Sequence, residues 1–234
     1  MTVVVLFDID GTLLRAGDPA HAEAMLTALS ETLGRPVALD GVPLAGMLDR
    51  QIARLALQRY GLDDATIERS LPTIMQRMAD QYRQRVRRGD RRTWVLPGVP
   101  ALLSELWRRG VLAGVLTGNA EGVARAKLAA AHLETLLPFG AYGDQADERH
   151  LLVEHAQSAL RTRYGIEVPR SRIVLVGDTP RDVAAAREAG ARVLAVATGR
   201  FSMEQLLAVG AHAALPDLAD VEHACQLLTE LVHR

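Results

Sequence analysis

Short apolar segments alternate with helix-like segments over most of this chain, and this alternation restricts the fold more than any other feature. Val3–Phe7 is a continuous, mostly β-branched apolar run, which is typical of a strand buried on both faces. Similar runs occupy 111–116, 173–176 and 192–197, and a weaker one occupies 212–215. Strands that alternate with helices predict parallel pairing through right-handed crossovers, and hence an α/β fold with a doubly wound sheet. The helices are expected at Val99–Arg109, Glu121–Ala131, Leu151–Tyr164 and Asp182–Ala189.

The segment 16–92 breaks the alternation, because it contains three helical patterns and no convincing strand. We therefore expect a Rossmann-like core formed by 1–15 plus 93–234, and a helical cap formed by 16–92 that covers the edge of the sheet where the strands end. The three cap helices are expected at His21–Leu33, Leu48–Tyr60 and Ala65–Arg88, the last interrupted by Pro72.

Composition narrows the protein classes. Apolar residues make up 49% of the 234 residues, enough for a packed core, and 27 basic residues nearly cancel 28 acidic ones. Such a balance argues against a nucleic-acid protein held by bulk charge. No signal-peptide pattern or membrane-length apolar run is visible, and the single cysteine, Cys225, excludes an intramolecular disulfide. We expect a cytoplasmic monomer or homodimer with no nucleic-acid or membrane partner.

The segment Asp8-Ile9-Asp10-Gly11-Thr12 places two acids directly after the first apolar run. The two carboxylates would repel each other unless a cation lay between them. With a divalent ion bound, Asp8 can remain ionised and attack phosphorus, while Asp10 can protonate the leaving oxygen and later accept a proton from water. Gly11 permits a tight turn whose amides could hold phosphate oxygens. The alternative interpretation is an ordinary acidic turn.

Two further polar segments follow predicted strands. Thr117, Gly118 and the helix-capping residue Asn119 could form an anion-binding corner at a helix N-terminus, although the same residues also make an ordinary cap. Asp178 ends another strand, and Asp182 lies four residues later. Their carboxylates suit Mg²⁺, although Asp182 could equally serve to begin its helix. All of these groups lie where parallel sheets bind ligands, outside the carboxyl ends of the strands.

The three segments, in this order, resemble the motifs of the haloacid dehalogenase-like hydrolase superfamily, specifically its phosphoglycolate-phosphatase-like branch with a helical cap. The resemblance covers essentially the whole chain. It implies a Rossmann-like core, a mobile cap and a phospho-aspartyl intermediate on Asp8. It also implies Mg²⁺ held by Asp8, the Asp10 backbone carbonyl and Asp178, with Asp182 in support. Thr117 would hydrogen-bond the transferring phosphoryl group.

One departure from the family pattern concerns the cation that balances charge between nucleophile and phosphate. Relatives commonly supply a lysine at the start of a Lys-Pro-x-Pro stretch, which is absent here. Arg149 occupies about the expected place after the strand-like 139–142. Lys127 is the other candidate, because it is the only lysine in a chain that otherwise uses arginine, although it lies some two turns into its helix.

The presence of Asp10 favours phosphate chemistry, because the dehalogenases that share this pattern lack the second aspartate. We therefore predict a Mg²⁺-dependent phosphatase that hydrolyses a small phosphorylated metabolite, such as a phosphoglycolate-like compound, a sugar phosphate or a nucleotide. A phosphomutase of the same superfamily and a non-catalytic regulator that binds a phosphometabolite are the alternatives. The regulator is disfavoured because both Asp8 and Asp10 are present.

Overall fold

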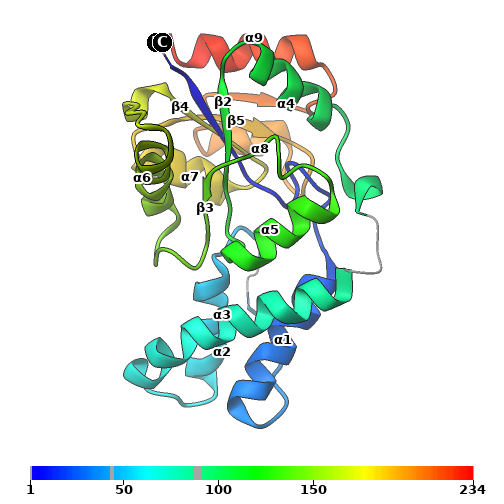
Figure 1. The fold of residues 1–234 in the computed structure, drawn as a ribbon, viewed down its shortest axis with the longest axis vertical. Helices are drawn as coiled ribbons and strands as arrows, with labels where there is room; N and C mark the ends of the chain where they lie inside the picture. The colour runs from blue at the N-terminus through cyan, green and yellow to red at the C-terminus, as the bar shows by residue number, and fades with distance from the viewer. Residues whose placement is uncertain (1, 43–44, 87–90, 234) are drawn as a thin grey trace.

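A parallel sheet flanked by helices forms one end of the molecule, and three further helices form the other end (Figure 1). The structure is a computed structural model that describes residues 2–42, 45–86 and 91–233. The strands of the sheet are parallel and lie in the order β3-β2-β1-β4-β5-β6, which confirms the predicted doubly wound fold. Their bounds are β1 Val4–Phe7, β2 Leu112–Leu116, β3 Gly140–Ala141, β4 Ile173–Gly177, β5 Arg192–Val196 and β6 Ala213–Leu215.

Both faces of the sheet are covered by helices, as the unbroken apolar runs predicted. Along β1, Val5 and Phe7 point into one hydrophobic cluster and Val4 and Leu6 into the other, with the period of two that a strand imposes. The first cluster is closed by α4 (Val99–Arg108), α5 (Glu121–Ala130) and α9 (Val221–Leu231), and the second by α6 (Leu152–Tyr164), α7 (Pro180–Glu188) and α8 (Met203–Ala208). Short 3₁₀ turns occupy Arg92–Trp94, Arg149–Leu151 and Arg170–Arg172.

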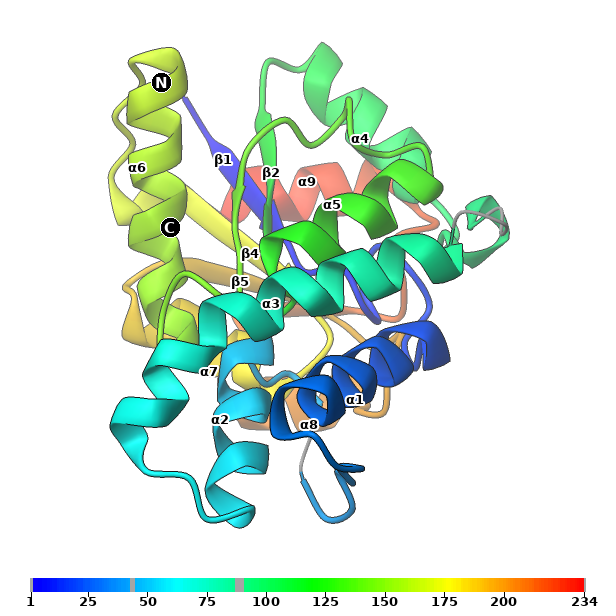
Figure 2. The same cartoon turned by 60° about the horizontal axis from the view of Figure 1, so that its bottom comes forward.

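The segment expected to form a cap contains α1 (Pro19–Leu33), α2 (Asp49–Arg59) and α3 (Asp64–Val86). These helices bury a third hydrophobic cluster of their own, which also takes in Ala120 and Val123 from the start of α5. Both views show α3 lying along α5 (Figures 1 and 2). The cap boundaries at 16 and 92 remain a proposal, which this separate cluster supports.

Pro72 does not interrupt its helix, contrary to our expectation. Helix α3 runs through it without a break. A proline inside a helix costs about 3 kcal/mol because a backbone hydrogen bond is lost. Pro72 is exposed, whereas its neighbours Leu71, Ile74 and Met75 are buried against the other cap helices. Their burial offsets the lost bond, since each large apolar side chain contributes roughly 1.5–3 kcal/mol.

None of the helices within the described ranges combines the length and the apolar character needed to cross a membrane.

Candidate active site

Three buried carboxylates meet at the carboxyl ends of β1 and β4. Asp8 directly follows β1, and its amide donates to the carbonyl of Val176 at 2.9 Å, so the ladder between the two strands extends to this residue. Asp178 follows β4, and Asp182 lies in the first turn of α7. One oxygen of each carboxylate lies within 4.8 Å of the other two. The side chains that sequence predicted as metal ligands on different segments are therefore brought together here.

Two glycines let the backbone approach this cluster. Gly11 has a φ of 86°, and a Cβ atom there would lie 2.3 Å from Oδ2 of Asp178. A Cβ atom at Gly199 would lie 1.9 Å from the same oxygen. Any larger residue at either position would displace the Asp178 carboxylate. Gly11 thus makes the tight turn that its sequence position predicted.

The acidic cluster is short of positive charge. The pKa of Asp8 is raised to about 6, chiefly because the carboxylate is buried; Arg149 opposes this rise, and the neighbouring charge of Asp182 adds to it. Burial, with Asp8 and Asp182 close by, raises the pKa of Asp178 to about 8. Oδ1 of Asp178 is buried without a hydrogen-bond partner among the described residues. Buried carboxylate oxygens with this deficit suit Mg²⁺, so the residues present fit the predicted ion.

Arg149 lies in the same cluster. Its Nη2 is 3.2 Å from Oδ1 of Asp8 and 2.6 Å from Oδ1 of Asp182, and its Nη1 donates to the carbonyl of Gly46 at 3.3 Å. The side chain is 8% exposed, so these contacts are largely shielded from water. Arg149 therefore links the nucleophile candidate, the α7 acid and a loop of the cap. It stands where the expected charge-balancing cation would need to be.

Lys127 contacts the other acid of the first motif. Its Nζ donates to both oxygens of Asp10 at 2.7 and 2.6 Å, and to Oδ1 of Asn119 at 2.7 Å. Nδ1 of His21 lies 3.2 Å from the same nitrogen. Lys127 lies some two turns from the N-terminus of α5, but its side chain spans this distance because helix side chains lean toward the N-terminus and lysine is long. The structure thus brings both candidate cations into the site, each against a different acid.

Asp10 has the opposite electrostatic environment from Asp8. Burial alone would raise its pKa, but the charges of Lys127 and His21, together with a 2.8 Å hydrogen bond from Nδ2 of Asn119, lower it below its ordinary value. Its carboxylate is turned toward Lys127 and Asn119, away from the three-acid cluster. Any contribution of Asp10 to metal binding would therefore come from its backbone carbonyl, as the resemblance implied.

Asn119 was predicted to cap α5, and this prediction is wrong. The N-cap residue is Ala120, and the Asn119 amide group bonds Asp10 and Oγ1 of Thr117 instead. The α5 amides are taken by carboxylates: Ala120 N donates to Oδ2 of Asp49 at 2.7 Å, and Glu121 N donates to Asp144 at 3.0 Å. Acids at a helix N-terminus are stabilised by its dipole, so protein carboxylates occupy much of the predicted anion-binding corner.

Asp182 both caps α7 and joins the acidic cluster, as the sequence allowed. Its Oδ2 accepts from the amide and hydroxyl of Thr179, and the Thr179 hydroxyl accepts from the Asp182 amide in return. This capping box starts the helix at Pro180, two residues earlier than predicted. The other oxygen of Asp182 remains directed at Arg149.

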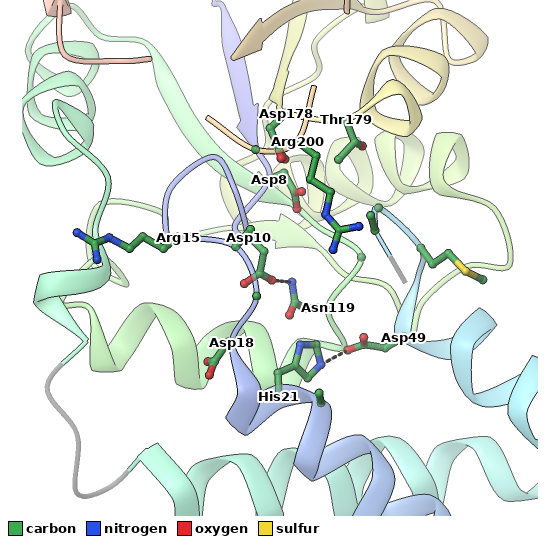
Figure 3. Close-up of a pocket in the computed structure, with 18 of the residues that line it drawn as sticks. Asp8, Asp10, Arg15, Asp18, His21, Asp49, Asn119, Asp178, Thr179 and Arg200 are labelled. Carbon is green, nitrogen blue, oxygen red and sulfur yellow. Dashed lines mark hydrogen bonds and ion pairs between the residues drawn. The ribbon is translucent and has the colours of Figure 1, made fainter. Parts of the chain in front are cut away.

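One cap residue in the site, His21, was not assigned to it from sequence. Nε2 of His21, from α1, lies 3.1 Å from Oδ2 of Asp49, the first residue of α2 (Figure 3). These side chains reach Lys127 and the α5 amide described above, so the cap closes over the Asp10 side of the site. A single histidine whose spacing from other polar residues matches no metal-binding pattern gives no indication in the sequence that it belongs to an active site. Only the packing of α1 against the core reveals its role.

A cavity of about 650 Å³ opens between the core loops and the cap. Asp8, Asp10, Lys127, Arg149 and Asp178 line its core side. Its size accommodates a small phosphorylated molecule. In Figure 3 the labelled acids and Arg200 surround this space, and His21 and Asp49 close it from below.

The Rossmann-like sheet has central strands that end in buried carboxylates, and a cation lies beside each acid of the first motif, an arrangement typical of hydrolases of the phosphatase class. The chain belongs to the haloacid dehalogenase-like hydrolase family, whose model matches residues 2–190. It is 32% identical to a phosphoglycolate phosphatase of Rhodospirillum rubrum over 94% of this chain and 90% of that protein. A plasmid-encoded phosphoglycolate phosphatase of Cupriavidus necator is 31% identical over 92% and 89%. The predicted branch and enzyme class, a phosphatase, are thereby confirmed.

Solved structures share the fold. A beta-phosphoglucomutase from Clostridium difficile superposes with a TM-score of 0.72 at 15% identity, covering 100% of both chains. CbbY from Rhodobacter sphaeroides, in complex with xylulose bisphosphate, gives a TM-score of 0.70 at 21% identity, covering 94% of this chain and 96% of that one. At such identities the likeness concerns the architecture, and it confirms the Rossmann-like core.

Proposed function

We propose that this chain is a Mg²⁺-dependent phosphatase that hydrolyses a small phosphorylated metabolite through a phospho-aspartyl intermediate on Asp8. The observation that carries the proposal is the pairing of two acids, two residues apart, with two separate cations. Arg149 contacts Asp8, and Lys127 contacts Asp10. A nucleophile and an acid–base group need different environments, and these contacts provide them.

In the first step an Asp8 oxygen attacks phosphorus, and the bond to the leaving oxygen breaks. Mg²⁺ at Asp8, Asp178 and the Asp10 carbonyl, supported by Asp182, would neutralise charge on the phosphoryl oxygens. Arg149 holds Asp8 in place and offsets the repulsion between this carboxylate and the incoming phosphate. We assign the charge-balancing role to Arg149, because its guanidinium reaches the nucleophile itself.

Asp10 must take up a proton in the enzyme–substrate complex, since Lys127 and Asn119 favour its ionised form; it then gives this proton to the leaving oxygen and regains one from the water that hydrolyses the phospho-aspartate. Lys127 and Asn119 orient its carboxylate. The ammonium also stabilises the Asp10 carboxylate that is left once the proton has been transferred. Lys127 is therefore proposed as a positioning residue for Asp10. Thr117, Gly118 and the turn at Gly11 are proposed to contact the transferring phosphoryl group.

The substrate class proposed is that of a small phosphate monoester, with phosphoglycolate as the first compound to test. The support is twofold: the curated relatives named above are phosphoglycolate phosphatases, and the cavity is of small-molecule size.

The test is phosphate release from a panel of phosphoglycolate, sugar phosphates and nucleoside monophosphates, with Mg²⁺ and with EDTA. We expect release only with Mg²⁺, none from Asp8→Asn, and a phosphoryl adduct on the Asp8-containing peptide after acid quench of the native enzyme. Glu134→Gln, an exposed acid of the core, is the matched control and should retain full activity. Full Mg²⁺-dependent turnover by Asp8→Asn would refute the mechanism.

A further inference from the structure

Arg200 lies in the loop that follows β5, and the backbone before it is held against the catalytic motifs. The Thr198 hydroxyl donates to the carbonyl of Gly11. Gly199 packs so closely on Asp178 that no side chain fits between them. After Arg200, Ser202 caps α8 by accepting from the Gln205 amide at 3.3 Å. The point from which the Arg200 side chain departs is therefore fixed beside the acidic cluster.

The Arg200 side chain extends from this loop into the active-site cavity (Figure 3). Three other permanent cations line the same cavity. Lys127 is paired with Asp10 and Arg149 with Asp8 and Asp182, whereas Arg15 points away from the acids in Figure 3. Arg200 is exposed, and within the described part of the chain no carboxylate pairs with it. Its guanidinium is thus the cavity cation that is available to a ligand.

The remainder of the cavity offers little else to a polar substrate. Its cap side is largely apolar, with Met25, Leu39 and Ile52 in the lining. Among its polar groups, His21 and Asp49 are hydrogen-bonded to each other, and Asp49 also accepts from an α5 amide. Asp18 accepts from the Tyr82 hydroxyl and from Arg91. A sugar ring would leave several hydroxyl groups without partners against such a wall, which is costly. A short substrate that carries one further charged group has no such hydroxyl groups and avoids this cost.

We propose that Arg200 binds a second anionic group of the substrate, a carboxylate or a second phosphate carried on a short carbon chain next to the transferring phosphate. The inference rests on the proposed phosphatase function and specifies its substrate. A guanidinium binds such anions through two parallel hydrogen bonds. Arg200 thereby acts as a specificity-determining residue, distinct from the two cations that contact Asp8 and Asp10.

The test compares 2-phosphoglycolate with ethyl phosphate, which has a methyl group in place of the carboxylate, and with the bisphosphate of a short diol. Steady-state kcat and KM are measured for wild type, Arg200→Ala, Arg200→Lys and the control Arg161→Ala, which changes an exposed arginine of α6 outside the cavity. We expect Arg200→Ala to lower kcat/KM about 10- to 100-fold, mainly through KM, for whichever dianionic compound the wild type prefers. Ethyl phosphate should change by about twofold or less, Arg200→Lys should recover part of the loss, and Arg161→Ala should have little effect.

Several outcomes would overturn the inference. An equal loss on ethyl phosphate would place Arg200 on the transferring phosphoryl group, and no loss on any substrate would place it outside the binding site. A wild type that prefers ethyl phosphate to both dianionic compounds would also exclude it. These results differ from a failure of the proposed function, in which the wild type releases phosphate from none of the three compounds. The preferred partner of Arg200, carboxylate or phosphate, follows from which of the two dianionic compounds shows the larger Arg200→Ala effect.

Discussion

The two acids of the first motif lie two residues apart, yet their surroundings differ in almost every respect. Asp8 belongs to a cluster of three carboxylates built by the core alone, with Arg149 as its cationic partner. Asp10 belongs to a network that joins core and cap, where Lys127 contacts both of its oxygens. The first cluster carries excess negative charge, and burial raises the pKa values of Asp8 and Asp178. In the network around Asp10, by contrast, the pKa of Asp10 is lowered.

This difference matches the two chemical tasks. An unneutralised cluster of hard oxygen atoms is suited to a divalent cation, whereas a neutralised acid held by fixed donors needs none. Alternation along an extended chain directs side chains i and i+2 to the same side. Here β1 ends at Phe7 and the chain turns from Ile9 onward, where the amides of Leu13 and Leu14 donate to the Ile9 carbonyl, so the two acids point to different surroundings. One short motif can therefore serve two separate sites.

The largest expected effect comes from Asp8→Asn. Removing the nucleophile should lower kcat by about 10⁴-fold or more, whatever the leaving group, because no other route to the phospho-enzyme remains. Asp10→Asn should instead lose about 10²- to 10⁴-fold on alkyl phosphates and far less on p-nitrophenyl phosphate, whose leaving group needs no proton. Measuring kcat/KM on both substrates checks this. Equal losses on the two substrates for Asp10→Asn would contradict its role as an acid.

The next effect separates the two cations. Arg149→Met should lower kcat/KM about 10²- to 10³-fold on both alkyl and p-nitrophenyl phosphates, because charge at the nucleophile matters for either. Lys127→Met should lower it about 10- to 100-fold on alkyl phosphates only, because it acts through Asp10. Melting temperatures of both variants control for unfolding. If Lys127→Met is the more harmful variant on p-nitrophenyl phosphate, the two roles are exchanged.

A third effect concerns stability in the absence of metal. The folded-state pKa of Asp178, about 8, lies above the ordinary 3.8. The stability linked to its neutral form is therefore fully present below the ordinary value and is lost as pH rises through about 8. At about pH 9 with EDTA, we expect Asp178→Asn to melt about 3 °C or more above wild type, and Mg²⁺ to stabilise only the wild type. A lower melting temperature for Asp178→Asn under these conditions would contradict a charge-deficient cluster.

The smallest effect should come from the cap side of the Asp10 network. His21→Ala removes one of the four contacts of Lys127 and the partner of Asp49. Because Lys127 keeps both oxygens of Asp10 and Asn119, we expect a loss of only about two- to fivefold in kcat/KM on alkyl phosphates. The control His155→Ala changes an exposed histidine of α6 and should be neutral. A loss as large as that of Lys127→Met would show that the cap governs Asp10 more strongly than the core does.

Much of the site followed from sequence because it is tied to local structure. Asp8 and Asp178 end strands of a parallel sheet, and parallel strands bring their carboxyl ends to one edge. Asp182 lies in the first turn of α7, four residues after Asp178, so its position follows from that of Asp178. In each case only a few residues separate the acid from a strand end, and their standard dihedral angles fix where the side chain lies.

Other features depended on contacts between distant segments. Asn119 forms hydrogen bonds with Asp10 instead of capping its helix, because the folded chain places a better-matched partner, Asp49, at the α5 amides. Helix α3 continues through Pro72 because buried neighbours hold it. The free guanidinium of Arg200 is recognised only once the partners of Lys127 and Arg149 are known.

The sequence by itself determined the alternation that builds the sheet and the acids that follow its strands, since periodicity and short motifs specify local geometry directly. The phosphatase class followed from the resemblance of these motifs to those of a known family. Only the tertiary structure decided which cation meets which acid. Lys127 and Arg149 each have long side chains with several rotamers, and their partners lie up to 141 residues away in the chain. Such pairings are settled by packing of the cap and core around a few buried charges, which no local pattern encodes.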